Sequence, residues 1–71
     1  MKVNSRQAMI HKFEFTQDEL RQAGGLESEW LDYMERTARI YLRREGFDNV
    51  GGDMSWDFSY DDRPSFLTLA I

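Results

Sequence analysis

Carboxylates are the residues of this chain with the clearest capacity for chemistry. Thirteen Asp and Glu face nine Lys and Arg, so the formal net charge is −4 and the pI is near 4.8. The charges fall in blocks: residues 14–35 hold seven acids and one Arg, and residues 45–71 hold six acids and one Arg. Spaced carboxylates can imitate a row of phosphates and occupy a site that another protein builds from Lys and Arg. Solubility alone would account for the same acidity.

We expect the contact residues of such a mimic to come mainly from the second half of the chain and its turns. A smaller group lies near residue 30. The first group is Asp48, Asp53, Asp57, Asp61 and Asp62, and the second group is Glu27, Glu29 and Asp32. The expected partner is a protein with a basic, nucleic-acid-binding groove. The acidic balance argues against direct binding of nucleic acid, which needs a basic surface.

Metal and histidine chemistry have little support. His11 is the one histidine, and the chain has no cysteine. The alternation around it places His11 on the core face of a strand, where we expect a hydrogen-bonded structural histidine rather than a catalytic one. A transition-metal site would need more His or Cys ligands. Residues 48–53 are rich in oxygen ligands but lack the register and final glutamate of an EF-hand, so we expect no metal.

Nucleophilic catalysis also has few candidates. The serines have no recognisable general base and no strained-turn context. The pairs Gly24-Gly25 and Gly51-Gly52 are not followed by the Lys-Ser/Thr of a phosphate-binding loop. We therefore expect a binding protein without a cofactor, and not an enzyme.

The basic residues cluster on one predicted helix. Asp32 and Glu35 stand four residues before two of them, a spacing that favours ion pairs along the helix. We interpret this surface as a solvated face of such pairs, and the alternative is a contact for nucleic acid or an acidic partner. The cluster consists of Arg36, Arg39, Arg43 and Arg44.

The elements that must position these residues follow from local patterns. Residues 9–15 alternate and predict a half-buried strand. Thr16 and Glu19 form a capping box that begins a short helix, which ends at Gly24-Gly25. Residues 26–45 predict a longer helix, with an apolar stripe from Leu26 to Leu42 and with Gly46 as its C-cap. Residues 54–60 and 65–71 alternate on either side of a turn and predict a hairpin.

These elements predict an α+β fold in the order strand, helix, helix, strand, strand, with a three-stranded, mainly antiparallel sheet carrying both helices. The last strand is apolar on both faces, so we place it between the other two. The length suits a single domain over residues 1–71, with residues 1–7 frayed. No run of about 18 apolar residues occurs, so we expect no membrane span and a cytoplasmic protein.

In size, acidity, lack of cysteine and the order of strand, two helices and hairpin, the chain resembles the small phage-encoded anti-CRISPR proteins, inhibitors of type I CRISPR-Cas systems. The long helix over residues 26–45 beside a short helix and a small sheet is similar to some of these inhibitors. The resemblance implies an inhibitor that binds the surveillance complex or its nuclease in the host cytoplasm, in several cases as a DNA mimic. It assigns no role to an individual residue.

Two other functions stay open. The first is a structural or assembly protein that forms a homodimer through an exposed edge strand, with Ile10 and Phe66 as apolar residues on the outer face. A monomer is nevertheless the expected state. The second is a small enzyme, which the missing catalytic constellation disfavours.

Overall fold

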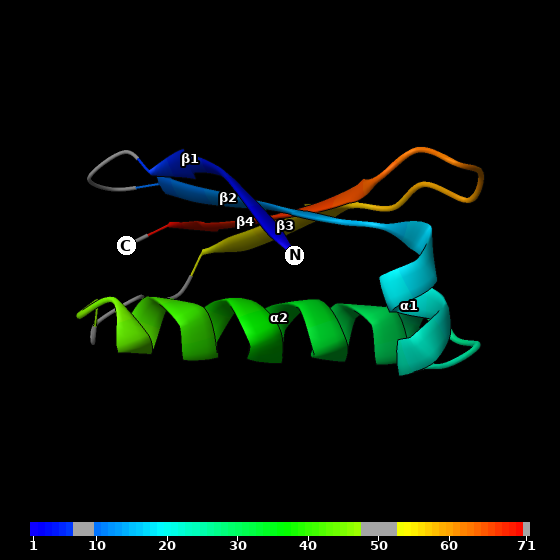
Figure 1. The fold of residues 1–71 in the computed structure, drawn as a ribbon, viewed down its shortest axis with the longest axis horizontal. Helices are drawn as coiled ribbons and strands as arrows, with labels where there is room; N and C mark the ends of the chain where they lie inside the picture. The colour runs from blue at the N-terminus through cyan, green and yellow to red at the C-terminus, as the bar shows by residue number, and fades with distance from the viewer. Residues whose placement is uncertain (7–9, 48–52, 71) are drawn as a thin grey trace.

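The structure is a computed structural model and describes residues 1–6, 10–47 and 53–70. Its elements follow the order β1 (Lys2–Arg6), β2 (Ile10–Phe15), α1 (Gln17–Ala23), α2 (Glu27–Arg44), β3 (Met54–Asp57) and β4 (Ser65–Ala70). Figure 1 shows two layers, with the sheet lying over α2 and with α1 at one end. The α+β class is therefore confirmed.

The sheet has four antiparallel strands in the order β1-β2-β4-β3. The prediction of three strands was wrong because Lys2–Arg6, expected to be frayed, pairs with β2. This strand lies at an edge of the sheet, and its pairing with β2 has a register shift between Val3 and Ser5. β4 does lie between β2 and β3, whereas β2 is interior and not an edge.

One predicted strand boundary also changes. β3 ends at Asp57, so the hairpin strand expected to reach residue 60 is shorter. Met9, the turn at Gly51-Gly52 and Ile71 lie outside the described residues.

The predicted capping box begins α1. The Thr16 hydroxyl accepts a hydrogen bond from the Glu19 backbone N–H at 3.2 Å, and the Glu19 carboxylate accepts one from the Thr16 backbone N–H at 3.1 Å. Phe15 before the cap and Leu20 within the helix are both fully buried, as a hydrophobic staple requires. These contacts fix the angle at which the chain leaves the sheet.

The Glu19 carboxylate also accepts a hydrogen bond from the amino group of Met1 at 2.6 Å. Partial burial would raise the pKa of Glu19, but this bond and those from Thr16 outweigh it, so the pKa lies below its ordinary value. Because the pKa falls on folding, the ionised group stabilises the fold above about pH 4.3, the ordinary value of Glu. That contribution is lost as the pH falls through the lowered pKa of the folded state.

Glu19→Gln should therefore lower the free energy of unfolding by about 0.5–1 kcal/mol at neutral pH. Glutamine keeps the cap but loses the charge. The difference from the parent should vanish once the pH has fallen below the lowered pKa of the folded state, and urea unfolding at neutral pH and in a series of acidic buffers checks it. The control is Glu29→Gln, since Glu29 accepts from the Leu26 backbone N–H at 3.2 Å in the equivalent position of α2. An equal loss in both variants would show that the amino-terminal contact does not matter.

Helix α2 is one residue shorter at each end than predicted and presents a buried stripe to the sheet. Met34, Ala38 and Leu42 carry this stripe. Leu26 does not belong to it, contrary to the prediction, because it is the extended N-cap residue and is 64% exposed.

The C-terminus of α2 closes with a Schellman turn. Glu45 is the C-cap, and Gly46 follows with a φ of +91°, a left-handed conformation that favours glycine. The Gly46 N–H bonds to the Arg43 carbonyl at 3.1 Å, and the Phe47 N–H bonds to the Leu42 carbonyl at 2.9 Å. The predicted C-cap Gly46 is thus shifted by one position. The turn directs Phe47 back toward the core, where it packs against the apolar cluster.

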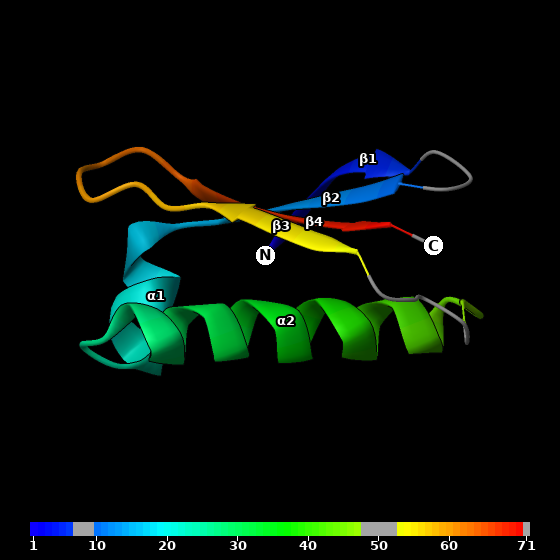
Figure 2. The ribbon, with the colours of Figure 1, turned by 180° about the vertical axis from the view of Figure 1, so that it is seen from behind.

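The core fills the space between the sheet and the helices. Aromatic rings of α2 pack edge-on against β2, with centroids 5.9 Å apart for Tyr41 and Phe13 and 5.8 Å apart for Tyr33 and Phe15. In Figures 1 and 2 no described element lies over the opposite face of the sheet. The buried apolar residues are Phe13, Phe15, Leu20, Met34, Ala38, Leu42, Leu67 and Leu69.

Candidate functional site

The carboxylates predicted to contact a partner lie on the surface. Asp48 is outside the described residues, and the other seven are exposed. They differ in whether a neighbouring group of the same chain already holds them. That difference separates carboxylates available to a partner from those engaged internally.

In the first group, Asp61 is held internally by Arg63. Its carboxylate accepts hydrogen bonds from the Arg63 backbone N–H at 2.9 Å and from the guanidinium at 3.0 Å. These bonds lower the pKa of Asp61 and raise that of Arg63. Asp61 therefore stabilises the turn before β4 and is only partly available to a partner.

The second group is not brought together. Glu29 and Asp32 line an open groove between α1 and α2, whereas Glu27 faces the loop before β4. The Tyr60 hydroxyl donates to Glu27, and this bond raises the pKa of Tyr60. The internal partners of the group are Tyr60 for Glu27, the Leu26 N–H for Glu29, and Arg36 for Asp32.

Asp53, Asp57 and Asp62 remain. None of them forms a salt bridge with another residue in the described part of the chain. Asp53 directly precedes β3, and Asp57 is its last residue. Asp62 lies in the loop between β3 and β4 and lines a hollow together with Arg21 of α1. Asp57 is close enough to Arg63 to contribute to the raised pKa of that guanidinium. We call Asp53, Asp57 and Asp62 the acidic edge.

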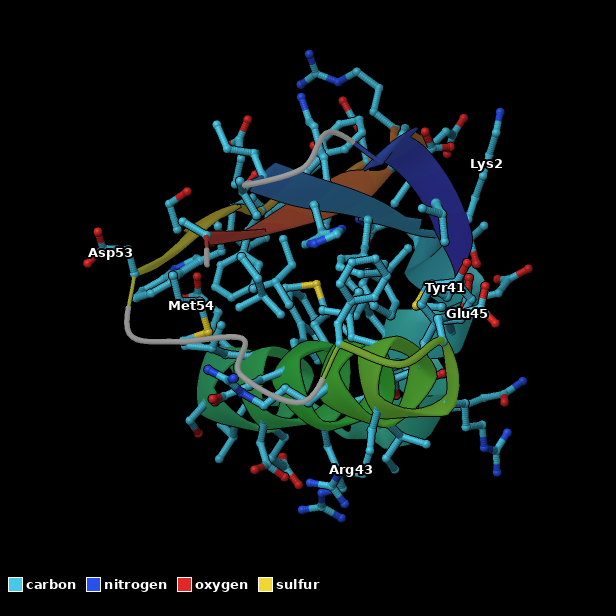
Figure 3. All side chains as sticks on the ribbon, turned by 90° about the vertical axis from the view of Figure 1, so that its left-hand side faces the viewer. Lys2, Tyr41, Arg43, Glu45, Asp53 and Met54 are labelled. Atoms are coloured by element: carbon cyan, nitrogen blue, oxygen red, sulfur yellow. The ribbon has the colours of Figure 1, made fainter. Side chains whose placement is uncertain are left out.

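Some cations lie beside the acidic edge, since Lys12 lines a hollow together with Asp57 and Arg21 lines a hollow together with Asp62. Others lie far from it. Figure 3 shows Asp53 and Lys2 on opposite flanks and Arg43 pointing away from the sheet on the far side of α2. Because β1 and β3 are the two edges of the sheet, the flank that carries Asp53 is the β3 edge. Asp53 and Asp57 lie along this edge, and Arg63 is close to Asp57.

Two exposed aromatic side chains close in sequence to the acidic edge were missed by sequence reasoning. In the alternating pattern of residues 54–60, Trp56 and Tyr60 belong to the set opposite to Asp57, yet they are 48% and 69% exposed. Trp56 shares the inner face with its register partner Leu67, but it lies on an edge strand, where no further strand covers its outer side. Tyr60 follows the end of β3, so strand alternation no longer sets its direction.

His11 is buried on the core face, as predicted, but the expected hydrogen bond is absent. The side chain is 1% exposed, and neither ring nitrogen has a hydrogen-bond partner in the described structure. Its ring packs edge-on against Phe47, with centroids 4.8 Å apart. The imidazole contacts an aromatic ring and not a polar group, because the Schellman turn places Phe47 beside it.

Two of the four arginines in the cluster form the ion pairs predicted from their spacing, which supports the interpretation as a solvated face. Arg36 bonds to Asp32, and Arg39 bonds to Glu35 at 2.9 Å. Arg43 and Arg44 are exposed in the last turn of α2, where cations suit the helix dipole.

The hollows identified among residues 1–6, 10–47 and 53–70 are open to solvent. The groove between α1 and α2 has a volume of about 310 Å³ and is open to solvent. Ser28 lies in it beside carboxylates, without a histidine. Within the same described ranges, no three side chains of His, Cys, Asp or Glu gather in a way that could hold a metal ion.

Comparison of the chain with protein-family models, curated proteins and solved structures finds no match. Among the described helices, none is both long and apolar enough to cross a bilayer.

Proposed function

We propose that this chain is a non-catalytic binding protein whose acidic edge occupies the cationic, nucleic-acid-binding site of a partner protein and blocks it. The observation that carries the proposal is the arrangement of Asp53, Asp57 and Asp62. They are exposed just before β3, at its last residue and in the following loop, and they make no salt bridge within the described residues. No internal ion pair has to be broken before these carboxylates meet a cationic surface.

The resemblance to anti-CRISPR proteins supports a type I CRISPR surveillance complex or its nuclease as the target. Such a target binds DNA through Lys and Arg side chains that contact phosphates. The three carboxylates would compete for these side chains, so binding should weaken steeply as salt rises. The inhibitor would act in the host cytoplasm as a DNA mimic.

The test is competition with labelled duplex DNA for a purified type I surveillance complex. Neutralising the acidic edge should weaken competition by about tenfold or more, because each lost contact is worth up to about 1 kcal/mol at a solvated surface. The variant is Asp53→Asn with Asp57→Asn and Asp62→Asn.

The matched control removes the same charge from acids that already have partners in the chain. The control variant combines Asp18→Asn, Asp32→Asn and Glu35→Gln, whose partners are Arg21, Arg36 and Arg39. It should compete as well as the parent. Equal losses in both variants would show that net charge alone acts, and no loss in either would remove the acidic edge from the contact.

A homodimeric assembly protein is the second candidate. Ile10 is 45% exposed on the uncovered face of the sheet. Phe66 lies on the same face, because its register partner Glu14 belongs to the same alternate set of β2 as Ile10. The Lys12 ammonium lies 4.7 Å from the centre of the Phe66 ring and covers part of it, which makes this face less apolar. Light scattering that gives twice the chain mass at high concentration would favour this function.

A further inference from the structure

We infer that β3 is an open sheet edge that takes an extended, lysine- or arginine-bearing segment of the partner as an additional strand. This inference rests on the proposed function, because it assumes a cationic partner, and it adds how that partner is held. Addition of a strand to an exposed edge is a known mode of peptide recognition, in which backbone hydrogen bonds supply affinity.

The backbone of β3 has free groups on the side away from β4. The Ala70 N–H bonds to the Asp53 carbonyl at 2.9 Å, which makes Asp53 and Ala70 a hydrogen-bonded pair of the ladder. Hydrogen-bonded and non-bonded pairs alternate in an antiparallel ladder. The pairs Met54 with Leu69 and Trp56 with Leu67 are therefore non-bonded. The N–H and C=O groups of Met54 and Trp56 point outward, toward a position that no described strand occupies.

Figure 2 shows this edge from its open side, with β3 in front of β4 and no described element outside it. Side chains alternate along a strand, so Asp53, Ser55 and Asp57 share the uncovered face of the sheet. A shallow hollow of about 330 Å³ opens beside Asp53 and Ser55. Trp56 projects to the other face and is 48% exposed. A strand added here would lie beside two carboxylates on one face and an indole on the other.

The charges of Asp53 and Asp57 indicate which type of segment would bind at this edge. Directly opposite positions of neighbouring strands interact, and like charges there are destabilising. An added strand with Lys or Arg opposite Asp53 and Asp57 would gain from both carboxylates. Arg and Lys also stack favourably on an indole ring, which suits the exposed Trp56.

A second copy of this chain fits the edge less well. Antiparallel pairing of two β3 strands centred on Ser55 would place Asp53 of each copy opposite Asp57 of the other, with like charges in contact. The other sheet edge, β1, is interrupted by the register shift between Val3 and Ser5, and such bulges hinder pairing between sheets. We therefore assign the edge to a basic segment of another protein.

The probe is a short synthetic peptide in which lysine alternates with threonine, titrated into the isotopically labelled chain and followed through its amide NMR signals. Bound peptide should shift the amides of Met54 and Trp56 most and slow their hydrogen exchange, since these N–H groups gain acceptors. A peptide with glutamate in place of lysine should cause no shift. Shifts confined to other parts of the molecule would overturn the inference.

A substitution at Trp56 tests the contribution of backbone pairing. Trp56→Pro removes the outward N–H and leaves the β4 ladder intact, because proline is tolerated on an edge strand where its N–H would face solvent. Its control, Trp56→Ala, loses the indole but keeps the N–H. Trp56→Pro should bind the lysine peptide about tenfold more weakly than Trp56→Ala. If the proline variant fails to fold, the amide shifts of the parent chain decide.

The double variant Asp53→Asn, Asp57→Asn tests the contribution of carboxylate charge, in both the peptide titration and the DNA-competition assay. If neutralisation abolishes binding and Trp56→Pro does not, pairing at the edge is overturned while the proposed function stands. If Trp56→Pro abolishes binding and neutralisation does not, the charge-based function fails and the open edge remains. Loss of binding both in Trp56→Pro and in the neutralised variant supports the inference.

Discussion

Replacing Phe13 with alanine is expected to lower the free energy of unfolding by about 3–5 kcal/mol, the range for truncating a buried phenylalanine. Phe13 lies at the centre of β2, is 0% exposed, and packs edge-on against Tyr41 of α2. Its register partners are Val3 on β1 and Leu67 on β4. The ring therefore connects three strands and the long helix, and its removal leaves a cavity that this rigid surround cannot close.

A domain of this size has a total stability of roughly 4–11 kcal/mol, so Phe13→Ala should leave a large fraction unfolded on mild heating. Urea unfolding followed by tryptophan fluorescence measures the change. The control is Phe66→Ala on the uncovered face of the same sheet, with an expected loss of about 1 kcal/mol. Equal losses at both positions would show that the two faces are equally buried in solution.

His11→Leu is expected to stabilise the protein, by about 2–4 kcal/mol. The imidazole is 1% exposed, and both of its nitrogens lack partners in the described structure. Burying a polar atom without a hydrogen bond costs about 1–3 kcal/mol, so two such atoms carry a substantial penalty. Leucine has a similar volume and would face the Phe47 ring and Leu69, its register partner on β4.

The melting temperature and the urea midpoint of His11→Leu both measure this gain. His11→Gln is the control, because it keeps polar atoms in the same buried place and should gain nothing. A variant His11→Leu that is less stable than the parent would show that the imidazole is hydrogen-bonded in solution and would overturn the expectation.

Local signals in the sequence predicted most of the fold. The capping box at Thr16 and the buried stripe of α2 depend on residues within a few positions of one another. The capping box was found as expected, and the stripe was found without Leu26. The edge strand β1 was missed because its place in the sheet depends on β2, and not on its own pattern. The end of α2 was misplaced by one residue because the left-handed glycine follows the C-cap and is not the C-cap itself.

The candidate site was less accessible to sequence reasoning. Exposure of the acids was predictable from their type, but their division into engaged and free carboxylates was not. Spacing in the sequence indicated the bonds of Asp32 and Arg36, since they stand four residues apart on a helix. The contact between Glu27 and Tyr60 joins distant parts of the chain, so it became visible only in the folded molecule. The open edge of β3 likewise depends on the strand order.

The position of β4 in the sheet affects when the chain can fold during its synthesis. β4 follows every other described strand in the chain, yet it lies between β2 and β3 and contributes Leu67 and Leu69 to the core. A nascent chain that has not yet released residues 65–70 from the ribosome can form its helices and the β1–β2 pairing, but β3 has no neighbour to join. We therefore expect the cooperative folding step to follow translation of this segment, at a rate set by closure of the long connection between β2 and β4.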